Sequence, residues 1–161
     1  MATPKELEQR FWKALKSDRT IMLGLSHTDR AHMRPMTAQF EDDNGPLWIF
    51  TSIDHDIVQS VPHDRDGVAT FVAKDHDLFA ALHGPLAVDN DRAVIDRLWN
   101  RFVAAWYEGG KSDPKLALLR FDVARAEIWE NTSSLMTGAK ALLGINPQKG
   151  YSDKVAEVKL N

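Results

Sequence analysis

The chain has 161 residues with 43% apolar side chains, which fits a single domain large enough to bury a core. Its 20 basic and 23 acidic residues leave a net charge of −3 without a basic block, so the charge pattern of a nucleic-acid-binding protein is missing. The absence of cysteine excludes disulfides, thiolate metal ligands and cysteine nucleophiles. No apolar run approaches the ~20 residues of a membrane-spanning helix, and we expect a cytoplasmic protein without membrane or nucleic-acid partners.

The N-terminal part of the sequence predicts one helix and then a run of short strands. Thr3-Pro4-Lys5-Glu6 is typical of a capping box with proline at the first helical position, and apolar residues at helical spacing extend the helix over residues 4–16. Asp42-Asp43-Asn44-Gly45 indicates a hairpin turn, because Asn-Gly suits the positive φ angles of tight turns. The strands expected on either side are residues 20–25, 32–41 and 47–52.

Short helices and strands alternate in the middle of the chain. A helix is expected over residues 54–61, ending before Pro62, and strands are expected over residues 68–73 and 78–88. Gly84-Pro85 lies inside the second of these strands and implies a bulge or an edge position.

A longer amphipathic helix is predicted after Asp91. Its apolar stripe runs from Val94 to Trp106, and Gly109-Gly110 ends it. The remaining expected elements are a long hairpin or bent pair over residues 116–123 and 126–130, a short helix from Ser133 to Leu143, and a strand over residues 155–160.

These elements predict an α+β fold. Short strands joined by tight turns favour an antiparallel sheet that closes into a barrel, with helices packed outside. We expect residues 1–161 to form one domain, with the N-terminal helix in residues 1–17 and a tail over residues 145–161. The sequence has no glycine-rich phosphate loop between a strand and a helix, so a Rossmann fold fits poorly.

Arg34 is the first candidate for a binding residue. Its strand parity is that of Met36 and Phe40, which places it on an otherwise apolar face. Only a register shift at Pro35 would change this placement. A guanidinium there needs an anion, and its planar fork fits either a carboxylate or a phosphate. From the residues alone, a structural ion pair is the favoured interpretation.

The end of the strand over residues 47–52 is the second candidate. Thr51 and Ser52 bring adjacent hydroxyls to the start of the next helix, where backbone N–H groups are free. Such a helix start is a natural anion site. An ordinary helix cap is the commoner explanation for any single sequence of this kind, so the signal is weak by itself.

Other constellations of residues carry less information. The six histidines do not combine with acids at a metal-ligand spacing, and we assign no metal site. No Gly-x-Ser-x-Gly elbow supports a serine triad, so we assign no catalytic residue. The five tryptophans are expected mainly in the core, but Trp129 stands apart because polar Glu130 and Asn131 follow it.

Three segments stand in an order that is typical of one protein family. They are Arg34-Pro35-Met36, Leu47-Trp48-Ile49-Phe50-Thr51, and Ala105-Trp106-Tyr107-Glu108-Gly109-Gly110-Lys111-Ser112-Asp113-Pro114 with Ala126-Glu127-Ile128-Trp129. Together they resemble the general stress protein 26 branch of the pyridoxamine 5′-phosphate oxidase-like, FMN-binding split-barrel superfamily. The likeness runs from about Glu6 to Leu143, and the Trp-Tyr-x-Gly-Gly-x-x-Asp-Pro segment is its most specific part.

The resemblance implies a six-stranded split barrel and a homodimer with two FMN sites shared across the subunit interface. By this analogy Arg34 would grip the FMN phosphate, and Trp129 from the other subunit would pack near the isoalloxazine ring. Phe50, Thr51 and Ser52 would offer donors near the phosphate and the ring. The full implied set of cofactor-binding residues is Arg34, Met36, Phe50, Thr51, Ser52, His55 and Trp129.

Two departures from the family pattern shape the expected function. Relatives carry a Lys or Arg at the start of the helix after the Phe-Thr strand, whereas this chain has Asp54-His55-Asp56, where a protonated His55 is the substitute cation. Losing a charge-assisted contact of ~1.5–3 kcal/mol lowers affinity about tenfold or more. Pyridoxamine-phosphate oxidases also carry an Arg-x-His-x-Arg cluster after the Trp strand. This chain has no Arg or His after Arg125, so that reaction is not expected.

The sequence therefore predicts an FMN-binding stress-type protein, with a low-activity flavin-dependent oxidoreductase as its enzymatic form. In that form the flavin supplies the redox chemistry and the protein supplies orientation. Two alternatives stay open, a non-catalytic module that sequesters flavin and a cofactor-free barrel that contacts other proteins. A deazaflavin or haem ligand is a further alternative.

Overall fold

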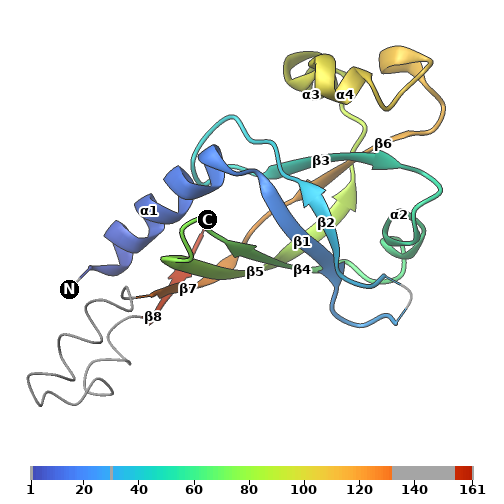
Figure 1. Ribbon diagram of the computed structural model, residues 1–161. Helices are drawn as coiled ribbons and strands as arrows, with labels where there is room; N and C mark the ends of the chain where they lie inside the picture. The colour runs from blue at the N-terminus through green and yellow to red at the C-terminus, as the bar shows by residue number, and fades with distance from the viewer. Residues whose placement is uncertain (1, 30, 132–154, 161) are drawn as a thin grey trace, which may run out of the picture.

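The structure, a computed structural model, describes residues 2–29, 31–131 and 155–160. Six strands follow the hydrogen-bonded order β2-β1-β4-β5-β6-β3, and all their pairings are antiparallel. A bridge between Gln39 and Trp48 brings the chain after β2 back to β3, so the sheet nearly closes (Figure 1). This is the α+β split barrel that the sequence predicted.

The elements of the described chain are α1 (Pro4–Ser17), β1 (Thr20–Leu25), β2 (Arg34–Thr37), β3 (Leu47–Ser52), α2 (Asp56–Ser60), β4 (Asp66–Val72), β5 (Leu78–Val88), α3 (Arg92–Leu98), α4 (Arg101–Ala104), the 3-10 turn η1 (Gly110–Ser112), β6 (Leu116–Phe121), β7 (Arg125–Glu130) and β8 (Val155–Lys159). The helix predicted from Ser133 to Leu143 lies outside the described residues.

The N-terminal elements form where the sequence predicted them. Thr3 and Glu6 make the full capping box of α1, and Pro4 occupies its first turn. In the turn before β3, Asn44 takes the positive φ of 66°, and the N–H of Gly45 donates to the carbonyl of Asp42. The segment before this turn is extended over fewer residues than the expected 32–41, because β2 ends at Thr37.

Strand β5 bends at Gly84 and serves both parts of the barrel. Its first part pairs with β4 and β7, while Leu86 to Val88 pair with β6. At the bend, residues 122–124 cross so close that a Cβ on Gly84 would lie 1.9 Å from the carbonyl oxygen of Asp122. The register shifts by one residue between the two pairings, because residues 122–124 lie opposite Gly84 and Pro85, so the extra residue of the bulge lies in the facing segment and not at Gly84-Pro85 itself.

Of the two arrangements expected for β6 and β7, a hairpin or a bent pair, the structure has the bent pair. Both strands run along β5 as consecutive segments of one bent path, and β7 pairs on its other side with β8. The backbone N–H groups of Asp122 and Ala124 donate to the carbonyls of Pro85 and His83, which keeps the chain on β5 instead of turning it back. The strand predicted at residues 155–160 is confirmed as β8.

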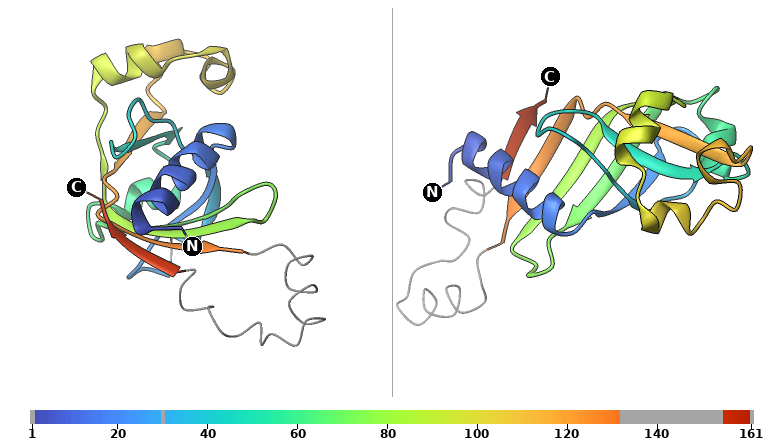
Figure 2. Two further views of the ribbon diagram at one scale, coloured as in Figure 1. Left: turned by 90° about the vertical axis from the view of Figure 1, so that its left-hand side faces the viewer. Right: turned by 90° about the horizontal axis from the view of Figure 1, so that it is seen from above.

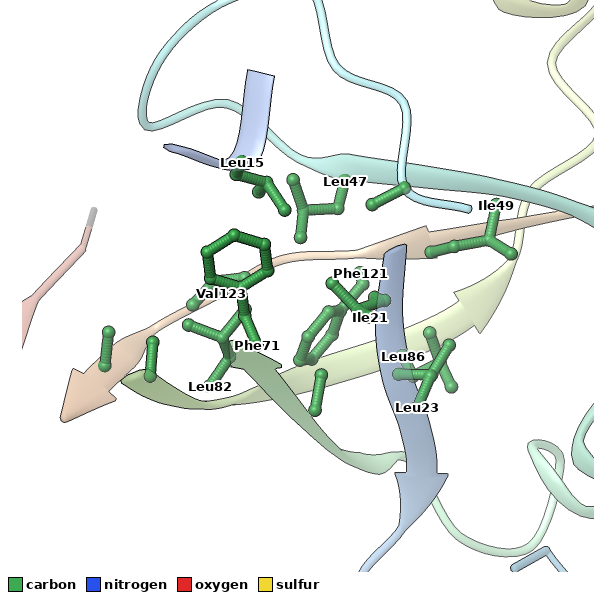
Figure 3. Packing of buried hydrophobic residues seen from close by; sticks show 14 of the residues in the cluster. Leu15, Ile21, Leu23, Leu47, Ile49, Phe71, Leu82, Leu86, Phe121 and Val123 are labelled. Carbon is green, nitrogen blue, oxygen red and sulfur yellow. The ribbon is translucent and has the colours of Figure 1, made fainter. Parts of the chain in front are cut away.

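The barrel core is filled from all sides by apolar side chains. Figure 3 shows Ile21 and Leu23 from β1, Phe71 from β4 and Leu82 from β5 turned toward one interior. Helix α1 lies along the barrel wall and adds Phe11 and Leu15, which are both fully buried (Figure 2). Burial of this kind stabilises the fold by ~1.5–3 kcal/mol for each large side chain.

A helical lobe, defined as residues 89–115, stands apart from the barrel (Figure 1). The single helix predicted there is wrong, because Trp99 adopts an extended conformation and Asn100 caps a second helix by accepting from Phe102 and Val103. The break turns two residues of the predicted apolar stripe outward, leaving Phe102 70% and Trp106 84% exposed.

Helix α2 is shorter than the predicted 54–61 and spans five residues, Asp56–Ser60. Its first turn lies directly after β3, so it adjoins the strand end that the sequence singled out. None of the helices in the described ranges has the length and apolar character needed to cross a membrane.

The close contact at Gly84 predicts a large stability loss for Gly84→Ala. Overpacking of a core typically costs ~1–3 kcal/mol, and we expect the upper end because the clashing atom belongs to the backbone and cannot rotate away. Gly110→Ala is the control. Gly110 has a φ of 63°, but an added methyl group there would meet nothing within 4 Å, so only a conformational cost of roughly 1 kcal/mol is expected. Urea unfolding measures both, and equal losses would show that crowding at Gly84 is not the cause.

Candidate functional site

Strand β2 carries Arg34 on its barrel-facing side. The register with β1 is unbroken from Leu23 opposite Arg34 to Thr20 opposite Thr37, so Pro35 does not shift it. Arg34 and Met36 are half-buried, whereas the alternate residues are exposed, and Met36 packs against the core. The predicted parity is therefore confirmed.

The guanidinium of Arg34 has no hydrogen bond or ion pair with any residue in the described ranges. Arg97 and Arg120, by contrast, each lie against a carboxylate. The structural ion pair that the sequence favoured for Arg34 thus finds no acid in the part of the chain that the structure describes. A half-buried cation without a partner is costly, so its fork is available to an external anion.

Thr51, Ser52 and His55 come together where β3 ends. The Thr51 hydroxyl lies 2.6 Å from Nδ1 of His55, and the N–H of His55 donates to the Ser52 carbonyl at 3.0 Å. Thr51 is buried and His55 is half-buried. The bond to Thr51 fixes one ring nitrogen of His55, whereas Nε2 has no hydrogen-bond partner among the described residues.

The backbone donors expected in this turn are largely committed to the protein itself. The N–H of Ile53 donates to the carbonyl of Lys115, and that of Asp54 to the Ser52 hydroxyl. With only five residues, α2 also adds little helix dipole. The N–H groups of Asp56 and Ile57 in the first turn of α2 have no hydrogen-bond partner among the described residues, so free backbone donors are confined to these two positions.

Arg34 and Thr51 lie at the same open end of the seam between β2 and β3. The bridge between Gln39 and Trp48 holds the two segments together with paired N–H to carbonyl bonds of 2.8 and 2.7 Å. Arg34 precedes this bridge and Thr51 follows it, and antiparallel segments place both on the same side of it. From the bridge the two strands spread apart (Figure 1).

Trp129 is not brought to this place within one chain. It lies on β7 between Phe79 of β5 and Val155 of β8, next to the β4–β5 turn. The end of β3 and strand β7 lie at opposite ends of the molecule in both Figure 1 and Figure 2. Any site that uses both Trp129 and Arg34 therefore needs two copies of the chain.

Sequence reasoning assigned no role to Tyr107, although it singled out the motif that contains this residue. The Tyr107 hydroxyl donates to the backbone carbonyl of Thr51 at 2.6 Å, and the side chain is buried. Burial, with a smaller contribution from the Asp113 carboxylate, raises the pKa of Tyr107 to about 12. The aromatic residue inside the Trp-Tyr-x-Gly-Gly motif was the available signal.

Phe50 points toward the lobe. Its ring packs edge-on against Trp99 with centroids 6.0 Å apart, and Trp99 in turn lies 5.9 Å from the Tyr107 ring. Phe50 therefore belongs to the small core of the lobe, which also includes Trp48 and Leu118. This packing disfavours a direct contact between the Phe50 side chain and a ligand bound at Arg34.

A polar cavity of about 810 Å³ lies beside α2. It contains none of the predicted cofactor-binding residues, and its carboxylates outnumber its one arginine. These charges disfavour an anionic ligand there. The residues around it are His27, Thr28, Asp56, Gln59, Ser60, His63, Asp64, Arg65 and Asp66.

Residues 6–149 match the family model described as pyridoxamine 5′-phosphate oxidase like. The chain belongs to this family. No curated protein sequence matches it.

Solved structures of similar proteins place the chain near the general stress branch. A general stress family protein of Xanthomonas campestris pv. campestris is 58% identical, with 83% of this chain and 93% of that chain covered and a TM-score of 0.77. The general stress FMN/FAD binding protein of Xanthomonas citri is 56% identical over 81% of this chain and 92% of that one, with a TM-score of 0.75. General stress protein 26 of Jannaschia sp. CCS1 is 27% identical over 96% and 99%, with a TM-score of 0.78.

Proposed function

We propose that this protein is a general stress-type, FMN-binding homodimer of the cytoplasm. The single observation that carries the proposal is Arg34, a half-buried guanidinium without a partner in the described ranges, at the same end of the β2–β3 seam as Thr51 and His55. The 56% identical protein of Xanthomonas citri is itself named for FMN and FAD binding, which supports a flavin as the ligand.

The chemistry of these side chains suits a phosphate group. Arg34 offers a planar fork that can hold two phosphate oxygens, and the Thr51 hydroxyl and the His55 ring add donors. Asp54 and Asp56 lie in the same turn and oppose an anion, but both are exposed, so water screens them.

The position of Trp129 supports the homodimer of this proposal. Within one chain it is at the other end of the molecule from Thr51, so it can cover a flavin held at Arg34 only as Trp129 of the partner subunit. Each dimer would then hold two flavins, and each site would draw on both chains. The alternative without a dimer leaves the half-buried Trp129 outside the site.

The bound flavin would supply hydride and electron chemistry, and the chain's own residues would hold and orient it. Arg34 and Thr51 would hold the phosphate end. Such an arrangement supports a flavin-dependent oxidoreductase of low activity. Oxidation of pyridoxamine phosphate is not proposed, because the chain lacks Arg and His after Arg125.

A second candidate function is flavin binding without catalysis. The hydroxyl of Tyr107 is already committed to the carbonyl of Thr51, so it offers no evident proton donor to a substrate. Reduction of the bound flavin by NADH or NADPH separates the two functions. Bleaching of the flavin absorption favours the oxidoreductase, and an unchanged spectrum favours the binding module.

Arg34→Ala should weaken FMN binding about tenfold or more, because a charge-assisted contact to phosphate contributes ~1.5–3 kcal/mol. Quenching of FMN fluorescence on titration with apoprotein measures the affinity. The fold should be preserved, since Arg34 has no described partner to lose. Arg97→Ala, which removes a surface arginine held by Glu41, is the matched control and should bind FMN as the unchanged protein does. Absence of saturable quenching by the unchanged protein at micromolar concentration would contradict the proposed function.

A shared site predicts complementation between two defective subunits. Arg34→Ala and Trp129→Ala homodimers should each bind FMN poorly, but a mixed dimer keeps one intact site. Co-expression should therefore restore about a quarter of the tight sites if pairing is random, and about half in mixed dimers isolated through two affinity tags. Stoichiometric FMN titration measures them. If both mutations act within one chain, the mixture binds no better than the separate variants.

His55→Lys should raise FMN affinity by about tenfold, because it places a permanent cation where relatives carry one. His55→Gln keeps a polar side chain without charge and serves as the control, with an affinity equal to or below that of the unchanged protein. Fluorescence quenching at pH 8 measures all three. No gain with lysine would mean that the phosphate does not lie near this turn.

A further inference from the structure

The lobe of residues 89–115 makes hydrogen bonds to the backbone at the end of β3 at two positions. The Tyr107 hydroxyl donates to the Thr51 carbonyl at 2.6 Å, and the Lys115 carbonyl accepts from the N–H of Ile53 at 2.9 Å. These two bonds bracket Ser52 and precede the turn in which Thr51 contacts His55. The lobe therefore sets the backbone from which the proposed phosphate donors project.

Tyr107 is itself fixed by its own motif. Both carboxylate oxygens of Asp113 accept backbone N–H groups, from Gly109 at 2.9 Å and from Lys115 at 2.9 Å. A Cβ on Gly109 would lie 2.9 Å from the Cα of Asp113, so only glycine allows this closure. Gly110 takes a φ of 63° in the same turn. The Gly-Gly-x-x-Asp segment thus folds into a tight turn that follows Tyr107 directly.

The Tyr107 side chain makes one polar contact among the described residues. It is 7% exposed, and its hydroxyl makes one hydrogen bond among the described residues, to the carbonyl of Thr51. Burial and the Asp113 carboxylate raise the pKa of its phenol to about 12, so it keeps its proton and stays a donor at any physiological pH. The Tyr107 ring contacts Trp99, and Trp99 contacts Phe50 of β3, the strand that also carries Thr51.

We infer that Tyr107 is a positioning residue for the cofactor phosphate: through its bond to the Thr51 carbonyl it holds the Thr51–His55 turn in the conformation that binds the phosphate. This inference rests on the proposed function, since it concerns the same FMN site. In this view the motif around Gly109-Gly110 anchors the lobe against the end of β3.

The test compares FMN with riboflavin, which lacks the phosphate. Tyr107→Phe keeps the ring and its packing but removes the hydroxyl. FMN affinity should fall about fivefold, the effect of one hydrogen bond, while riboflavin affinity stays unchanged. Fluorescence quenching gives both affinities. An unchanged ratio of FMN to riboflavin affinity would overturn the inference but would not contradict FMN binding itself.

Asn100→Ala is the matched control within the lobe. Asn100 caps α4 through the N–H groups of Phe102 and Val103, so its loss destabilises the lobe without removing the bond to Thr51. The ratio of FMN to riboflavin affinity should stay that of the unchanged protein. If Asn100→Ala lowers the ratio as much as Tyr107→Phe does, general loosening of the lobe explains the effect and the inference is overturned.

Hydrogen–deuterium exchange of the protein without cofactor provides a readout that does not depend on FMN. Amides of residues 51–58 should exchange faster in Tyr107→Phe than in the unchanged protein or in Asn100→Ala. If the unchanged protein does not bind FMN, the proposed function fails, and this exchange alone decides whether Tyr107 orders the turn. Equal exchange in all three proteins would overturn the inference whatever the binding result.

Discussion

Strand β5 belongs to two parts of the barrel at once, and its bend at Gly84 is the constraint on which the architecture depends. Before the bend it pairs with β4 and β7, and after it with β6. Because the crossing segment lies within contact distance of the backbone, a residue with a side chain would push it away. After the bend, β5 leads into the lobe, and Tyr107 of the lobe donates to the carbonyl of Thr51 at the end of β3.

The proposed site depends on the charge of Arg34, which no acid among the described residues balances. A half-buried guanidinium normally takes a carboxylate partner, as Arg120 does in this chain with Asp122. Arg34 has none among the described residues, so the fold tolerates a cost that a bound anion would remove. The neighbouring acids Asp54 and Asp56 limit that gain.

Local patterns in the sequence were sufficient for most elements but not for how they pair. The capping box of α1 and the alternation in β2 are short-range signals, and both predictions from them are confirmed. Pairing of β7 with β8 is a long-range property, and the break at Trp99 depends on packing against Phe50 and Tyr107 that no local pattern reveals. For the same reason Arg34 and Thr51 were recognised as separate signals, while the tyrosine that connects the lobe to them was not.

Strand β8 has a consequence for how the protein behaves in solution. By pairing along β7 it covers a row of backbone groups that would otherwise be open to strands of other molecules. Glu157 and Lys159 then stand on the new outer edge, and charged side chains there oppose further pairing. Without β8 the backbone edge of β7 would be open to other strands, so this strand opposes edge-to-edge aggregation.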